Sequence, residues 1–147
     1  GSSWSEVTNM PTATRNTRMC GSQTAALGAG GYQGYYPGSS INNSYEYDGT
    51  NWTSGGTMNN AGEWGGIAGT QTAAVCAGLY PTNGQTEEYN GISWKSVNSL
   101  SQGRGYGGRA GTQSSGMLSG GNYGAPNVRH CANTEMYYTH YIKTGCE

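Results

Sequence analysis

The acidic side chains are the first candidates for chemistry in this sequence, because two carboxylates can perform acid–base catalysis. A glycoside hydrolase needs such a pair facing each other across a sugar ring. Glu87 and Glu88 are adjacent, so on a strand they point to opposite faces of the sheet. Glu46 and Glu88 occupy equivalent positions of an internal repeat, which indicates a structural role. We therefore predict that the protein is not an enzyme and has no catalytic residues.

Histidine and cysteine offer a second kind of chemistry, metal binding. His130 and Cys131 are adjacent, and His140 and Cys146 follow them. Zinc ligands usually occur in short paired spacings, which these residues lack. No glycine-rich loop of the phosphate-binding type is present either. We predict no metal site and no cofactor.

The four cysteines are better interpreted as oxidised than as catalytic or metal-binding. Cys131 and Cys146 occur only in the last copy of the repeat, and we predict a disulfide between them that staples the C-terminal hairpin. Cys20 and Cys76 lie in strands of small residues, where two buried thiols or a second bridge are both compatible with the sequence. An even number of cysteines in a chain with few charges favours an extracellular or virion-surface protein.

Aromatic and amide side chains gather in a segment of variable length that follows each glycine-rich strand. Loops of this kind are where repeat proteins place their specificity, and Tyr with Ser, Gly and Asn is typical of adaptable recognition surfaces. We predict ligand contacts from Tyr35, Tyr36, Tyr80, Asn83, Tyr123, Asn127 and Arg129, with Arg104 and His130 as further polar candidates. For Tyr32, Tyr80 and Tyr123 we favour the alternative that they cap the core. Tyr35 and Tyr36 are additional to the repeat and are better candidates for binding.

The amino-acid composition limits which secondary-structure elements can position these side chains. The 147 residues include 27 Gly and no Phe, and the net charge is −1. A near-neutral chain lacks the basic patch of a nucleic-acid-binding protein, and no apolar run of about 18 residues is present to span a membrane. Gly, Ser, Thr and Asn are poor in helix interiors. We therefore expect an all-β protein whose core uses its Trp and Tyr residues.

An internal repeat organises the sequence. The segment Gly21-Ser22-Gln23 returns as Gly69-Thr70-Gln71 and again as Gly111-Thr112-Gln113, with a shorter interval before the third copy. Three tryptophans precede these segments at one constant spacing: Trp4, Trp52 and Trp94. A third landmark is a pair ending in tyrosine: Glu46-Tyr47, Glu88-Tyr89 and Met136-Tyr137. We predict that the three tryptophans are equivalent and largely buried, and that the three tyrosines are structural.

Each copy of the repeat offers four short strands. Asp48-Gly49 and Asn90-Gly91 lie between the third and the fourth, and such dipeptides are strong hairpin signals because Gly accepts a positive φ. Four antiparallel strands in every 40–50 residues, roughly, predict the blades of a β-propeller.

The repeat also resembles known families. Gly30-Gly31 and Gly120-Gly121 end a small-residue strand and have a Tyr directly or one residue after them, which resembles the kelch motif, whereas the second copy departs from it with Gly78-Leu79. The stretches 69–74 and 88–94 are similar to repeats in tail-fibre-like proteins of environmental bacteriophages. The kelch resemblance covers nearly the whole chain and implies that the first strand of each blade is innermost and the Trp strand outermost.

The repeat divides a single domain into an outer strand at 1–17 and blades at 18–65, 66–107 and 108–147. Closed propellers have about 4–8 blades, so three blades do not close a ring. We expect a head-to-tail homo-oligomer, with a dimeric six-bladed ring preferred over a filament. In that ring the strand around Trp4 adds to the last blade of its neighbour near Ile142, where the repeat lacks its Trp.

Two functions are compatible with these features. The first is a lectin-like recognition module on a phage fibre or another extracellular appendage, which binds a glycan or a receptor. The alternative is a purely structural, self-assembling β-protein of a fibre or sheath. A third class, an oxidase of the kelch-bearing type, requires metal ligands that the sequence does not offer.

Overall fold

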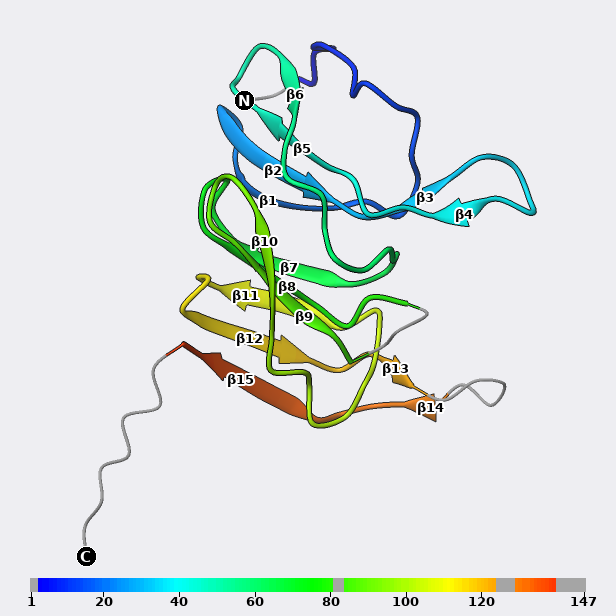
Figure 1. The fold of residues 1–147 in the computed structure, drawn as a ribbon, viewed down its shortest axis with the longest axis vertical. Helices are drawn as coiled ribbons and strands as arrows, with labels where there is room; N and C mark the ends of the chain where they lie inside the picture. The colour runs from blue at the N-terminus through cyan, green and yellow to red at the C-terminus, as the bar shows by residue number, and fades with distance from the viewer. Residues whose placement is uncertain (1–2, 81–83, 124–128, 140–147) are drawn as a thin grey trace, which may run out of the picture.

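The computed structural model describes residues 3–80, 84–123 and 129–139, and in these residues it contains strands and no helix. Three antiparallel, blade-like sheets are stacked along the long axis of the molecule (Figure 1). The first has the order β1 (Arg18–Ser22), β2 (Ala25–Ala29), β5 (Ser44–Tyr47), β6 (Trp52–Ser54). The second contains β7 (Gly66–Gly69), β8 (Ala74–Ala77), β9 (Thr86–Tyr89) and β10 (Trp94–Val97). The third contains β11 (Gly108–Gly111), β12 (Ser115–Ser119) and β15 (Thr134–Tyr138). The predicted all-β class is confirmed.

Two short hairpins extend from the same side of the stack (Figure 1). They are β3 (Tyr32–Gln33) with β4 (Ser39–Ser40), and β13 (Asn122–Tyr123) with β14 (Arg129–His130). Both follow the second strand of their sheet, where the sequence places its segments of variable length.

The turns between the third and fourth strands follow from local side-chain chemistry. Asp48 Oδ1 accepts hydrogen bonds from the backbone N–H groups of Thr50 and Asn51 at 2.8 and 2.7 Å. Asn90 does the same at the equivalent turn. The following Gly49 and Gly91 have φ values of 95° and 89°. The expected hairpins are therefore present, and in each the Asx side chain stabilises the turn by accepting hydrogen bonds from two backbone N–H groups.

The core lies between the first and second sheets. It consists of Leu27, Ala29, Met58, Ile67, Ala74, Cys76, Leu79, Tyr89 and Trp94. Small residues in the inner strands let the sheets approach closely, while Tyr89 and Trp94 fill the wider space toward the outer strands. The inner strands β1, β7 and β11 contact one another in succession.

The predicted equivalence of the tryptophans holds for two of the three. Trp52 and Trp94 begin the fourth strands and lie opposite Tyr47 and Tyr89, each with its ring centroid 4.9 Å from that of its tyrosine. Trp94 is buried, whereas Trp52 is partly exposed. Trp4 is fully exposed, and residues 3–14 form no strand, so the expected burial of Trp4 is wrong. The first sheet already has its four strands, and no further strand among the described residues lies beside Trp4.

Each contact between consecutive sheets repeats the same side-chain hydrogen bonds. Gln71 Nε2 donates to Tyr47 O at 2.8 Å, and Gln113 Nε2 donates to Tyr89 O at 2.6 Å, so the Gln of each landmark binds the preceding sheet. In the same direction, from the following sheet to the preceding one, the Tyr137 hydroxyl donates to Glu88 Oε1 at 2.8 Å.

Two carboxylates, one fully buried and one partly buried, hold the segments that connect the sheets. Glu87 is fully buried and accepts the backbone N–H groups of Asn59 and Asn60 at 2.8 and 2.9 Å. Glu135, the equivalent residue of the third sheet, accepts the N–H of Ser101 at 2.8 Å and pairs with the buried Arg104. Arg104 is thus committed to an internal ion pair, which corrects the expectation of a polar ligand contact.

Candidate functional site

A residue that precedes each inner strand adopts the left-handed conformation. These residues are Asn16, Trp64 and Tyr106, with φ values of 60°, 59° and 63°. They are separated by the same two intervals as the landmark glycines Gly21, Gly69 and Gly111. A non-glycine residue with positive φ is uncommon and costs free energy, so its recurrence marks a conformation imposed by the tertiary structure.

Three aromatic rings meet at this end of the second and third sheets, and we call Trp64, Tyr80 and Tyr106 the aromatic platform. The Trp64 and Tyr106 rings are stacked, with centroids 4.7 Å apart and planes inclined by 25°. The Tyr80 ring lies on Trp64 at 5.1 Å. Tyr80 and Tyr106 are 38% and 48% exposed, so both rings present surface to solvent while Trp64 holds them in place.

Polar groups border the aromatic platform. Glu63 is buried beside it and accepts a hydrogen bond from Asn16 Nδ2 at 2.7 Å. The Tyr106 N–H donates to Trp64 O at 3.0 Å, which joins the two left-handed residues through the backbone. Burial, and then the negative charge of Glu63, raise the pKa of Tyr106. The phenol therefore stays protonated near neutral pH and can donate or accept a hydrogen bond.

The first sheet contributes a different group at the same end. The guanidinium of Arg15 lies 4.4 Å above the centroid of the Tyr32 ring. Backbone bridges join Arg15 to Tyr32, Glu63 to Tyr80 and Gly105 to Asn122. By this register Asn122, and not Tyr123, is the equivalent of Tyr32 and Tyr80, because the third copy carries its tyrosine one position later than the first two.

The predicted ligand contacts are only partly brought together. Tyr80 belongs to the aromatic platform. Tyr35 and Tyr36 are 96% and 90% exposed at the tip of the β3–β4 hairpin, and no ring contact joins them to the platform among the described residues. Tyr123 is half-buried and pairs with Arg129 through the backbone, while Asn83 and Asn127 lie outside the described residues. His130 Nδ1 lies 2.9 Å from Asn122 Oδ1.

Sequence reasoning missed two members of the platform. Trp64 and Tyr106 belong to none of the phrases that define the repeat, and each of them is followed by a glycine. The interval between them is the signal that identifies them, because the same interval separates the landmarks Gln71 and Gln113.

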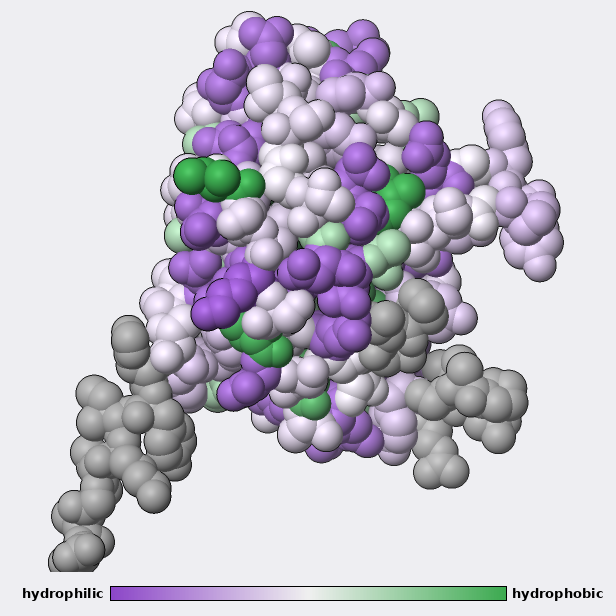
Figure 2. All heavy atoms as spheres, in the orientation of Figure 1, coloured by the Kyte–Doolittle hydropathy of each residue, from purple (hydrophilic) through white to green (hydrophobic). Residues whose placement is uncertain are grey.

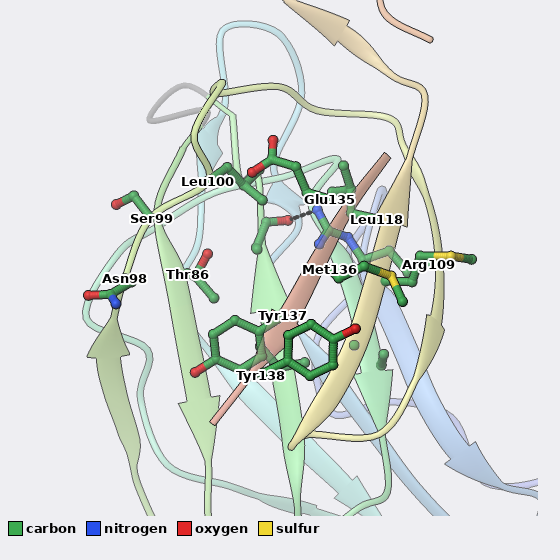
Figure 3. A pocket seen from close by; sticks show the side chains of 15 residues that line it. Thr86, Asn98, Ser99, Leu100, Arg109, Leu118, Glu135, Met136, Tyr137 and Tyr138 are labelled. Atoms are coloured by element: carbon green, nitrogen blue, oxygen red, sulfur yellow. Dashed lines mark hydrogen bonds between the residues drawn. The ribbon is translucent and has the colours of Figure 1, made fainter. Parts of the chain in front are cut away.

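A cavity lies between the second and third sheets. It has a volume of ≈ 520 Å³ and lies between Thr86, Leu100, Arg109, Leu118, Glu135 and Tyr137, among other residues (Figure 3). Its walls are largely apolar. The Arg109 guanidinium reaches across it and donates to the carbonyl oxygen of Ala77, and burial lowers the Arg109 pKa to about 10. This cation binds the neighbouring sheet, so the cavity belongs to the contact between the two sheets.

The described cysteines are free thiols. Cys131 Sγ lies 3.6 Å from Gln102 Oε1, so the expected disulfide with Cys146 is not confirmed, and Cys146 lies outside the described residues. Burial raises the pKa of Cys20 to about 11 and that of Cys76 to about 12, which keeps both thiols protonated and unreactive.

The described ranges contain neither a cluster of metal-ligating side chains nor a membrane-spanning helix. No three His, Cys, Asp or Glu side chains within them are grouped as metal ligands. No helix among them is long and apolar enough to cross a membrane. On the face shown in Figure 2, apolar side chains lie in small separate patches within a polar surface.

Comparisons with known proteins support the fold alone. No protein-family model matches the chain, and no curated protein matches it. Among solved structures, the one titled "Structure of YjhT" superposes with a TM-score of 0.71 and 17% sequence identity, over 89% of this chain and 45% of that one. The chain therefore spans less than half the length of YjhT. At this identity the likeness shows a shared β-rich fold and leaves the kelch resemblance an expectation.

Proposed function

We propose that the protein is a non-enzymatic recognition module that binds a glycan through the aromatic platform. The observation that carries the proposal is the contact of Trp64 with the stacked Tyr106 ring and the tilted Tyr80 ring, which exposes both tyrosines beside Glu63 and Asn16. The C–H face of a sugar ring packs on exposed aromatic faces, and its hydroxyl groups hydrogen-bond to phenol and amide groups. The buried Glu63 holds the amide of the partly exposed Asn16 in place. Rings that are already fixed by Trp64 lose little conformational entropy on binding.

The placement of the hairpins supports a binding face at this end. The β3–β4 hairpin carries the exposed Tyr35 and Tyr36, and it extends from the same side of the stack as β13–β14 (Figure 1). In our proposal these loops select the ligand around the platform, in a kelch-like propeller exposed on a virion or another extracellular appendage.

Calorimetric titration with a panel of neutral, amino and acidic oligosaccharides tests this function. We expect saturable binding to at least one class, and a loss of affinity of about tenfold or more in Tyr106→Ala and in Tyr80→Ala, since aromatic anchors dominate binding energy. Ile92→Ala is the control, because Ile92 is 81% exposed in a turn and belongs to neither the platform nor the hairpins. Absence of binding across the panel, or affinity unchanged in both tyrosine variants, would refute the proposal.

The second candidate function is a structural building block of a fibre or sheath. It is favoured by exposed methionines on the outward faces of the first and third sheets, namely Met19, Met117 and Met136. The two functions are compatible, because the platform lies at the ends of the strands and the methionines lie on the faces of the sheets.

A further inference from the structure

The outward face of the first sheet matches a face that is buried elsewhere in the molecule. Met10 and Met19 lie over Gly28 on this face, which we call the leading face. Met19 is 51% exposed. The repeat equivalents of these residues in the second sheet are Met58 and Ile67, at 1% and 8% exposure, which the first sheet covers.

The outward face of the third sheet is the complementary case. Met117 on β12 and Met136 on β15 are cross-strand neighbours, and they are 39% and 56% exposed. We call this the trailing face. Leu27, the equivalent of Met117 in the first sheet, is fully buried under the second sheet. The leading and trailing faces are thus the two halves of a contact that the chain already makes internally.

The N-terminal segment corresponds in sequence to the fourth strand of the second sheet, although it does not itself pair as a strand. Trp4-Ser5-Glu6-Val7 corresponds in the repeat to β10, Trp94-Lys95-Ser96-Val97. In β10 these residues pair with β9, with Trp94 opposite Tyr89 and Val97 opposite Thr86. Trp4 and Val7 are instead 103% and 63% exposed. By the same register, the matching position in the third sheet is the edge of β15 that faces away from β12.

The glutamines of the repeat indicate a third correspondence between the leading and trailing faces. Gln71 and Gln113 each bind the carbonyl oxygen of a tyrosine in the preceding sheet, Tyr47 and Tyr89. Gln23 is exposed, and its side chain forms no hydrogen bond within the described residues. The repeat equivalent of the two acceptor tyrosines in the third sheet is Tyr137.

From these matches we infer that the leading face of one copy of this chain docks on the trailing face of a second copy, with residues 4–7 added to β15 as its fourth strand. In this arrangement Trp4 lies opposite Tyr137 of the second copy, and Gln23 donates to the carbonyl oxygen of the same tyrosine. The contact is intermolecular because the N-terminal end and β15 lie at opposite ends of the molecule (Figure 1). Two such contacts close a dimer of six sheets. The inference is independent of glycan binding.

Sedimentation velocity measures the association directly. We expect a species of twice 15.4 kDa that dissociates on dilution. Trp4→Ala and Gln23→Ala should each shift the dissociation constant upward, by about tenfold or more for Trp4. Ile92→Ala, an exposed site off both faces, should leave it unchanged. On association the fluorescence of Trp4 should shift to shorter wavelength. A wild-type chain that stays a monomer at roughly 100 µM, well above typical dissociation constants of stable dimers, would overturn the inference.

A gain-of-affinity variant keeps the test independent of folding defects. Met136 stands where the first and second sheets have Glu46 and Glu88, which accept hydrogen bonds from Tyr89 and Tyr137. Met136→Glu in the trailing face should let Tyr47 from the leading face of the other copy donate to the new carboxylate and tighten the dimer by about tenfold. Adding Tyr47→Phe to the same chain should cancel the gain. If Met136→Glu weakens association, or if the gain persists without the Tyr47 hydroxyl, the faces do not meet in the inferred register.

Discussion

The hydroxyl of Tyr89 donates a hydrogen bond to Glu46 Oε1 at 2.5 Å, across the contact between the first and second sheets. Tyr89 is almost fully buried, and its ring packs on Trp94. Since Tyr137 and Glu88 form the equivalent bond across the next contact, this pair is part of the repeating connection between sheets.

Removing the Tyr89 hydroxyl should destabilise the fold in a pH-dependent way. Burial, and then the hydrogen bond to Glu46, raise the pKa of Tyr89 from 10.0 to about 12. A raised folded-state pKa means that the protonated phenol stabilises the fold below the unfolded-state pKa, and this contribution is lost as the pH rises through the folded-state pKa. Tyr89→Phe should lower the free energy of unfolding by about 1–2 kcal/mol at pH 7. Urea unfolding between pH 7 and 11.5, roughly, measures the difference, which should shrink at the alkaline end. Tyr36→Phe, at a 90% exposed site, is the control.

The glutamine landmarks should contribute to the contacts between sheets. Gln71→Ala and Gln113→Ala each remove an amide donor from a carbonyl oxygen of the preceding sheet, and each should cost about 1 kcal/mol. Gln33→Ala changes an exposed glutamine of β3 and should be close to neutral. Equal stability of all three variants in chemical denaturation would contradict a role for these amides.

Glu87 should be among the most sensitive positions of the chain. Its carboxylate accepts four hydrogen bonds, from the backbone and side-chain N–H groups of Asn59 and Asn60. Glu87→Gln places an amide donor against these donors, and we expect a loss of about 2–4 kcal/mol. Glu6→Gln, in an exposed segment, controls for the change of charge. A melting temperature of Glu87→Gln equal to that of the control would show that the connecting segment is held in another way.

Replacing each of the three repeat tryptophans by alanine should lower the free energy of unfolding by a different amount, although the repeat predicts that the three are equivalent. Trp94→Ala removes a buried ring whose Nε1 donates to Ser44 Oγ, and it should cost about 3–5 kcal/mol. Trp52→Ala should cost less because Trp52 is partly exposed and donates to Thr8 O at the surface. Trp4→Ala should leave the stability of the monomer unchanged. Denaturation at protein concentrations below the dissociation constant of any dimer measures the series.

The sequence by itself determined the fold class and the period of the repeat. Asp48-Gly49 and Asn90-Gly91 mark turns through their own side chains and their own backbone freedom, so they can be recognised without knowledge of the rest of the chain. The spacing from Trp52 and Trp94 to the glutamine landmarks survives as equivalent strand positions, because each repeat builds the same local meander.

Only the tertiary structure decided which repeats meet and which residues lie without a neighbour. Trp64 and Tyr106 are one repeat apart in the sequence and stack only because consecutive sheets bring equivalent positions together. The packing of consecutive sheets also gives Glu87 its hydrogen-bond donors, which come from the segment before the second sheet. Trp4 is exposed because no strand among the described residues lies beside it as β9 lies beside Trp94. Local patterns specify one repeat. The burial of any residue at its boundary depends on what packs against that repeat, and this is a property of the assembled sheets.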